Sequence, residues 1–232
     1  MDTLTTVADR EVRAAAPAGS PFAPRNMRLL WMKPTRFFTI GLDLGAPKHF
    51  IPAILLAGIS QATGRIDKEL MRADLGRPGP GWEIWGPVVT ESWLNFWLFA
   101  LAVGALAAGF IWYVGGWWYR VRIKWSGDER PDKKLARLVY SYSLLVSVVP
   151  ALLLLVAQTL LYDNYLAVWN SDEVASAILL IFPFWSCVTS YRGVRARFDV
   201  RAGRARLWFL VLPMFVYAFV FGVVGVLYAL LG

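Results

Sequence analysis

Side chains that could act as nucleophiles, bases or metal ligands are scarce in this chain of 232 residues. The chain has one cysteine, Cys187, and one histidine, His49, which excludes an intramolecular disulfide, a thiolate metal cluster and a multi-histidine metal site. No basic partner stands near Cys187 in sequence, although an activated thiol would need one. His49 is interpreted as a membrane-surface residue at the end of an apolar stretch. We therefore expect no cofactor, no metal and no enzymatic activity.

Acidic and basic residues are absent from five long stretches of the chain. These stretches are 49–64, 92–119, 138–162, 174–191 and 207–232. An aspartyl protease acting inside a membrane would need two buried carboxylates, and a proton or ion pathway would need ionisable groups at depth. The stretches contain neither. Their uncharged polar residues, among them Ser147, Gln158 and Ser186, are expected to form hydrogen bonds between helices.

The composition indicates a membrane protein. The chain is 57% hydrophobic and 17% charged, whereas a soluble domain has about 25% charged residues. A helix needs about 20 apolar residues to cross a bilayer, and buried helices of soluble proteins usually keep a charged face. The sequence therefore predicts an all-α fold, a polytopic transmembrane helix bundle of five spans with short interfacial helices.

The distribution of Lys and Arg predicts the orientation of these spans. With five crossings, residues 1–48, 120–137 and 192–206 share one side and hold twenty of the 24 basic residues, while the loop at 65–91 holds four. If 49–64 did not cross, thirteen basic residues would lie on one side of the membrane and eleven on the other, and this near-equal distribution would not indicate an orientation. The excess of positive charge on cytoplasmic loops then predicts a cytoplasmic amino terminus and a carboxyl terminus on the outer side.

Three regions follow from this pattern. Residues 1–26 are rich in Ala, Pro and Thr and are predicted to be a disordered cytoplasmic tail. Residues 27–48 are predicted to be an interfacial amphipathic segment, in which Phe37 and Phe38 lie on the membrane; an ordinary connecting segment is the alternative. Residues 49–232 form the predicted five-helix transmembrane domain.

At the end of the second stretch the chain changes from apolar to aromatic, then to basic and finally to polar residues. This junction covers residues 113–134, YVGGWWYRVRIKWSGDERPDKK. Trp and Tyr rings favour the membrane interface, and Arg120, Arg122 and Lys124 follow in the zone where anionic lipid attracts cations. Because these basic residues alternate with apolar ones, we expect one side of the segment to touch lipid and the other to meet headgroups or a partner. The polar SGDERP then predicts a turn before the next helix.

A second basic segment, YRGVRARFDVRAGRAR, covers residues 191–206 and includes Arg192, Arg195 and Arg197. So many arginines would also suit RNA. The segment lies between two predicted spans, so lipid headgroups or a protein partner explain it more simply than nucleic acid does. Membrane lipids, other membrane proteins or a second copy of the chain are the expected partners, and no nucleic acid.

Small residues and prolines mark where helices could meet or bend. Gly104 and Ala108 have small-xxx-small spacing, and Gly115 and Gly116 each weaken a helix by about 1 kcal/mol relative to Ala. We expect all four to lie against another helix, although small residues are common in membrane helices generally. Three prolines are expected to kink the later spans, with a transport hinge as the alternative: Pro150, Pro183 and Pro213.

Several of these segments resemble the Yip family, the Ypt/Rab-interacting-protein domain, in its bacterial form. KPTRFF (33–38) is similar to the Pro-x-x-Phe-Phe opening of bacterial members, and VGG (114–116) before a basic loop resembles their Gly-Gly segment. ARLVYSYSLLVSVVP (136–150) is similar to the Tyr-Ser…Pro pattern of the third span. The resemblance covers residues 33–232 and implies a five-span plan with a cytoplasmic amino terminus, here in a bacterial inner membrane with the carboxyl terminus in the periplasm.

One departure limits what this resemblance implies about partners. Eukaryotic members carry an Asp-Leu-Tyr-Gly-Pro-like motif before the first span, where this chain has Asp43, Leu44, Gly45, Ala46 and Pro47. The aromatic residue is missing and the glycine is displaced, so Rab binding is not carried over. The expected function is that of a non-enzymatic scaffold or adaptor for other membrane components. The alternative is a small permease or channel for a neutral or lipid-like solute.

Overall fold

The structure is a computed structural model that describes residues 19–171 and 178–231. Within these ranges all regular elements are helices, so the predicted all-α class is confirmed. The helices are α2 (Pro24–Met32), α3 (Pro34–Thr39), α4 (Pro47–Asp74), α5 (Trp82–Thr90), α6 (Trp93–Phe110), η1 (Ile111–Gly115), α7 (Gly116–Ser126), α8 (Lys133–Leu161), α9 (Tyr165–Trp169), α11 (Ile181–Arg197), α12 (Ala202–Arg206), η2 (Leu207–Val211) and α13 (Leu212–Leu231).

The amino-terminal segment folds back onto the bundle. Residues 1–18 of the predicted tail lie outside the described residues, but α2 begins at Pro24, within the range 1–26. Phe37 and Phe38 were expected to lie on the membrane, yet both are buried in the core. A Cβ added to Gly193 would lie 2.7 Å from the Phe38 ring. The missing side chain there lets α3 pack against α11, which removes the phenylalanines from any lipid.

Local signals in the sequence begin and end the long helices. The side chain of Asp132 accepts a hydrogen bond from the backbone N–H of Leu135 and caps α8. Gly127, with φ of 124°, ends α7 within the predicted SGDERP turn. Gly76, with φ of 65°, follows α4, and this backbone conformation favours glycine. Helix α4 is therefore longer than the stretch 49–64 and continues into the predicted outer loop.

Three helices among the described residues are long and apolar enough to cross a membrane. They are Trp93–Ser126, which joins α6, η1 and α7, then Lys133–Leu161, and Ala202–Val223, which joins α12, η2 and the first part of α13. These helices contain residues 93–119 of the second predicted stretch, 138–161 of the third and 207–223 of the fifth. The first stretch lies in α4, and α11 contains residues 181–191 of the fourth, whose residues 174–177 lie outside the described residues.

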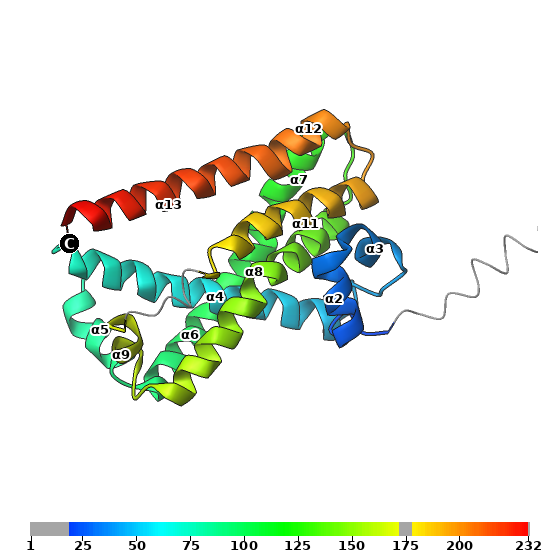
Figure 1. Ribbon diagram of the computed structural model, residues 1–232. Coiled ribbons are helices and arrows are strands. Elements are labelled where there is room, and N and C mark those ends of the chain that lie inside the picture. Colours follow the sequence, from blue (N-terminus) through cyan, green and yellow to red (C-terminus); the bar gives the residue numbers. More distant parts are fainter. Residues whose placement is uncertain (1–18, 172–177, 232) are drawn as a thin grey trace, which may run out of the picture.

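The long helices run between two ends of the molecule, and each end has its own short helices and its own core cluster. Helices α5 and α9 lie at one end, near the end of α4, while α2, α3 and α12 lie toward the other (Figure 1). A core cluster at the first end includes Leu70, Trp82 and Tyr165. Another, toward the opposite end, includes Phe38 and Tyr119.

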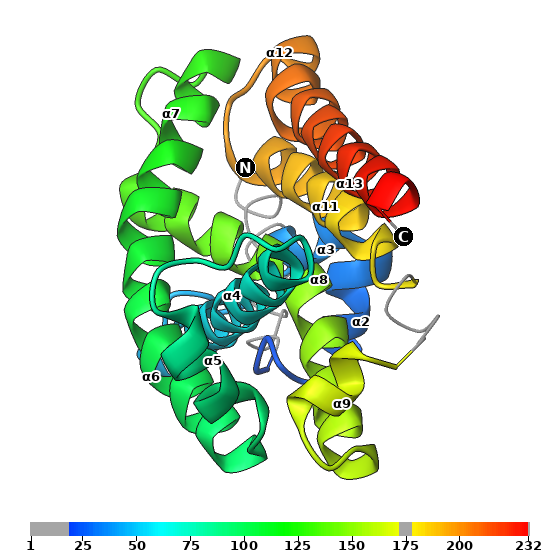
Figure 2. The same ribbon diagram turned by 90° about the vertical axis from the view of Figure 1, so that its left-hand side faces the viewer.

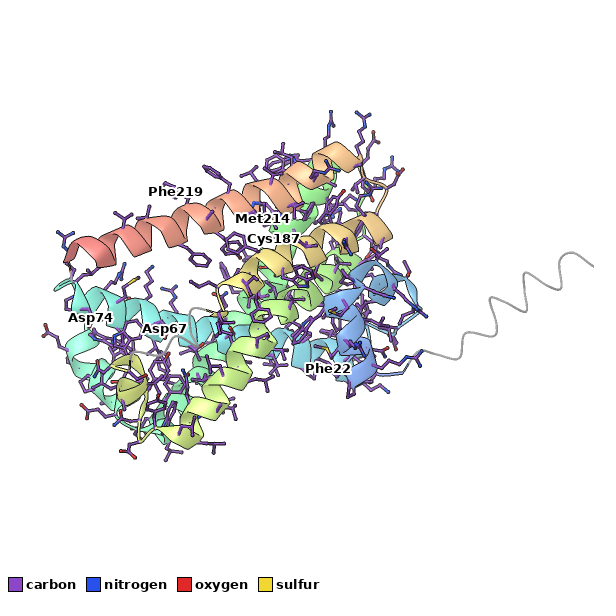
Figure 3. All side chains as sticks on the ribbon, viewed as in Figure 1. Phe22, Asp67, Asp74, Cys187, Met214 and Phe219 are labelled. Carbon is purple, nitrogen blue, oxygen red and sulfur yellow. The ribbon has the colours of Figure 1, made fainter. Side chains whose placement is uncertain are left out.

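Helix α13 is the least enclosed of the long helices. It lies beside α11 and stands apart from α4 (Figures 1 and 2). Phe219 points away from the bundle (Figure 3) and is 63% exposed. Because its exposed side chains are almost all apolar, this helix would be stable only where lipid or another apolar surface surrounds it.

Candidate functional site

Exposed basic side chains from separate parts of the chain gather at one end of the bundle. The backbone N–H of Arg201 donates to the carbonyl of Ser126 at 2.9 Å, which joins the two basic segments. An N–H of Arg197 donates to the carbonyl of Phe38 at 3.2 Å, which joins the second basic segment to α3. The exposed basic residues of this end include Lys33, Arg36, Lys124, Lys133, Lys134, Arg192, Arg195, Arg197, Arg201, Arg204 and Arg206.

Arg122 does not share the exposed position that the sequence predicts for it. An α-helix turns 100° per residue, so residues that alternate in sequence do not share a face, and α7 directs Arg122 toward the protein. Its guanidinium carbon lies 4.3 Å from the centre of the Phe209 ring and 5.8 Å from that of Tyr119. Lys124, two residues later, is exposed, and Arg120 donates to the carbonyl of Pro131 at 2.9 Å.

The backbone of η2 explains why Arg122 occupies this position. In a regular helix the carbonyl of Trp208 would accept from the N–H of Leu212, but that N–H bonds to the carbonyl of Leu207 across a wide π turn. The next possible donor belongs to Pro213, which has no N–H. Arg122 donates to the Trp208 carbonyl instead. A side chain of α7 thus replaces the hydrogen bond that the π turn and Pro213 remove from the last long helix.

The small residues of α6 lie against α4 of the same chain. A Cβ added to Gly104 would lie 2.9 Å from the backbone of Ile59. A Cβ added to Gly58 would lie 2.1 Å from the carbonyl oxygen of Gly104 and 3.0 Å from the Cβ of Ala108. Gly104 and Ala108 therefore meet a third small residue, Gly58, that the sequence pattern did not identify. They close a contact within the chain, so they are not free to bind another molecule.

The two adjacent glycines of the junction lie against α8. A Cβ added to Gly115 would lie 2.6 Å from the Tyr140 ring, and one added to Gly116 would lie 2.4 Å from the Cγ of Arg137. The guanidinium of Arg137 in turn lies 5.5 Å from the ring centre of Trp112, a contact of the cation–π type. Both glycines therefore accommodate large side chains of the neighbouring helix.

The three prolines occupy different local settings. Pro150 lies inside α8, which continues on both sides of it. Pro183 is the third residue of α11, in the first turn, where the backbone N–H has no partner within the helix. Pro213 follows η2 and has no N–H to donate to the carbonyl of Trp208, which accepts a hydrogen bond from Arg122 instead. Because Pro183 lies in the first turn, it removes no hydrogen bond from within the described part of α11.

Polar residues of the predicted spans line separate cavities in the described part of the chain. A cavity of about 70 Å³ lies between α8, α11 and α13 and is lined by Ser186, Cys187 and Ser190, among others. Figure 3 shows Cys187 on the side of α11 that faces α13. Gln158 instead lines a cavity of about 510 Å³ toward the opposite end. A continuous polar path through Gln158 and Ser186, as a permease would need, is thus not formed by these cavities.

Hydrogen bonds between helices accompany the small cavity. The hydroxyl of Ser186 donates to the carbonyl of Ser143 at 2.9 Å and joins α11 to α8, as predicted for a polar residue in a span. The hydroxyls of Tyr119 and Ser190 lie 2.9 Å apart and join α7 to α11. Tyr119 is fully buried, although its place beside two tryptophans in sequence suggested a residue at the membrane surface.

The larger cavity is lined by a partly buried acid, Asp67, at the end of the molecule opposite the basic residues. Asp67 follows the apolar stretch of α4 and accepts a hydrogen bond from the hydroxyl of Tyr165, while Asp74 accepts one from the indole of Trp169 at 2.9 Å. Both carboxylates lie on α4 (Figure 3). Burial raises the pKa of Asp67 to about 6, although the hydrogen bond from Tyr165 acts in the opposite direction. The sequence pattern did not identify these two hydrogen bonds, because each joins residues more than ninety positions apart in the chain.

Comparisons with known proteins agree with the membrane-protein interpretation. The model of the Yip1 domain matches residues 29–224. No curated protein and no solved structure matches the chain. The match begins within α2 and ends within α13, so it includes all the long helices described above. The predicted relationship is confirmed: the chain belongs to the Yip1 domain family, a family of non-catalytic membrane proteins.

Proposed function

We propose that this protein is a non-enzymatic scaffold or adaptor in a membrane, which binds other membrane components through its basic end. The observation that carries the proposal is that α2–α3, the 124–134 segment and the 192–206 segment, whose basic residues are largely exposed, lie toward one end of the bundle (Figure 1). Such a surface attracts anionic lipid headgroups and acidic segments of proteins over about 8 Å in physiological salt.

The proposed orientation places this basic end in the cytoplasm. We propose five crossings, made by α4, α6–α7, α8, α11 and α12–α13, with the amino terminus in the cytoplasm and the carboxyl terminus in the periplasm of a bacterial inner membrane. The opposite end supports this orientation because its loop at 65–91 holds only four of the 24 basic residues. Reporters fused to each terminus, each active in only one compartment, test the arrangement. If both termini report the same compartment, the five-span proposal is wrong.

Charge removal at the basic end tests the adaptor role. Lys124, Arg195 and Arg204 come from both basic segments and are exposed, so replacing all three with Gln should leave the packing of the bundle unchanged. We expect the triple variant to lose most of the cross-links that the wild-type protein forms with neighbouring components in native membranes. The reason is that three positive charges are removed from the proposed contact surface.

A matched control uses the opposite end of the molecule. Arg65, Lys68 and Arg77 are also exposed, and their replacement with Gln removes the same number of positive charges from the opposite end. This control should keep the wild-type pattern of cross-links, and the terminal reporters should give unchanged signals in both variants. If the two triple variants lose the same cross-links, or neither loses any, the basic end is not the contact surface.

A further inference from the structure

The guanidinium of Arg122 carries a partly buried positive charge, and in the described part of the chain no acidic side chain forms an ion pair with it. Within residues 19–171 and 178–231 the one ion pair joins Arg72 to Glu69, at the other end of the molecule. The titratable groups nearest to Arg122 include Tyr119, Tyr140 and Cys187, which are neutral when protonated. Removing a cation from water without a counter-ion is costly, and contact with aromatic rings offsets about 0.5–2 kcal/mol of that cost.

The hydrogen-bonding capacity of Arg122 is also incompletely used. A guanidinium has five N–H donors, and the hydrogen bond from Arg122 to a protein acceptor in the described structure goes to the carbonyl of Trp208. The ring faces of Phe209 and Tyr119 attract the charge but are not strong acceptors. An arginine with free donors in a sheltered place is suited to a phosphate, whose oxygens match the planar fork.

A cleft leads from the surface of the bundle to this guanidinium. It lies between α7 and the beginning of α13, has a volume of about 330 Å³ and, besides Arg122, is lined by Trp118, Trp208, Leu212, Pro213, Val216 and Tyr217. Arg122, Pro213 and Tyr217 also line the small polar cavity of 70 Å³ behind it. The guanidinium therefore stands between an apolar entrance and a polar interior.

The cleft opens on the outer surface of the bundle beside the first turns of α13. In the proposed five-span arrangement, lipid surrounds this surface. Val216 and Leu212 are 49% and 39% exposed, and the exposed residues farther along α13 are also apolar. Trp118 and Trp125 form a T-shaped pair with ring centres 5.4 Å apart, and Trp125 lies 4.6 Å from Trp208. Tryptophans concentrate at the depth of lipid headgroups, so the cleft lies where a headgroup would meet the guanidinium.

We propose that the cleft between α7 and α13 binds one anionic phospholipid, with its phosphate on Arg122 and the beginning of an acyl chain along Trp118, Leu212 and Val216. The apolar entrance distinguishes this ligand from a free phosphate, which gains nothing from contact with Leu212 and Val216. The positive charge of Arg122 favours a headgroup with net negative charge over a zwitterionic one. The residues that line the cleft in the described structure include no carboxylate that could pair with the ammonium group of a zwitterionic lipid. The site is separate from the exposed basic surface and does not depend on the adaptor role.

Lipid retention in native mass spectrometry tests this proposal on the full-length protein in detergent. Phosphatidylglycerol, phosphatidylcholine and inorganic phosphate are the three probes. We expect one phosphatidylglycerol to bind tightly, phosphatidylcholine to bind more weakly, and millimolar phosphate not to displace the lipid. Arg122→Gln should weaken phosphatidylglycerol binding about tenfold or more, since charged hydrogen bonds are lost. Lys68→Gln, at an exposed position of α4 near the opposite end of the molecule, should leave it within twofold.

A second variant keeps the test decisive if Arg122→Gln fails to fold. Val216→Trp fills the entrance and leaves the hydrogen bond of Arg122 to Trp208 in place, so it should also weaken phosphatidylglycerol binding. Val226→Trp, which adds the same ring at an exposed position of α13 outside the cleft, should not. The proposal is overturned if folded Arg122→Gln or Val216→Trp binds like the wild type, if phosphatidylcholine binds equally well, or if inorganic phosphate displaces the lipid.

Discussion

Replacing Gly58 with Ala should open the contact between α4 and α6, which is the most extensive helix contact of the bundle. The new Cβ would lie 2.1 Å from the carbonyl oxygen of Gly104 and 2.8 Å from the backbone nitrogen of Ala108. Because these atoms belong to the backbone, no side chain can rotate away, and the helices must separate by about 1 Å. A gap of 0.5–1 Å forfeits a quarter to a half of each contact, about 2 kcal/mol over roughly forty atom pairs at about 0.1–0.2 kcal/mol each.

The same helix supplies the control for this prediction. A Cβ added to Gly64 would have no atom within 4 Å, so Gly64→Ala gains the higher helix propensity of alanine without a clash. Since both variants gain this propensity, about 1 kcal/mol, it cancels in their comparison. We expect Gly58→Ala to unfold with a free energy about 2 kcal/mol below that of Gly64→Ala.

Unfolding in detergent micelles, followed by the fluorescence of the tryptophans, measures this difference. Cross-links between cysteines introduced on α4 and α6 would show directly whether the two helices have moved apart. If Gly58→Ala is as stable as Gly64→Ala, the close approach of the two helices at Gly104 is not a feature of the folded protein, and the reasoning is refuted.

Other predictions concern single polar groups. Because burial raises the pKa of Asp67 to about 6, its folded form binds a proton more tightly than the unfolded chain. The free energy of unfolding should therefore fall by up to about 3 kcal/mol as pH rises from 4 to 6, and Asp67→Asn should abolish that fall in a melting series against pH. Tyr119→Phe removes the hydroxyl that lies 2.9 Å from that of Ser190 and should lower the free energy of unfolding by about 1 kcal/mol, whereas Tyr113→Phe, at a residue 64% exposed, should be neutral in the same assay.

Patterns along the chain were sufficient for the helices and for the separation of charge. Apart from residues 92, 162 and 178–180, the described residues of the charge-free stretches lie in long helices, and the turn between α7 and α8 falls at the expected SGDERP. Within the outer loop at 65–91, the segment RIDKELMRADLG indicates a short helix ended by Gly76, and the structure has helix there as the continuation of α4 to Asp74. Helix α5 at Trp82–Thr90 was not expected. Nothing between Gly64 and Asp74 terminates a helix, because a glycine without a clash weakens it by only about 1 kcal/mol.

The candidate site depends on contacts that no local pattern contains. The sequence places Arg122 among residues that resemble a headgroup-binding strip, but the π turn before Pro213 provides the carbonyl that draws it inward. Phe37 and Phe38 look equally suited to a lipid surface, and the absence of a side chain at Gly193 lets Phe38 pack inside.

The sequence by itself determined that the chain is helical, that its helices suit a membrane and which segments carry the positive charge. These properties follow from composition over windows of about 20 residues. Only the tertiary structure decided which small residues meet, that Gly58 completes the contact of Gly104 with Ala108, and that Arg122 borders a cleft. The physical reason is that lipid tails are as apolar as leucine, so hydrophobicity does not distinguish a face that touches lipid from one that touches protein.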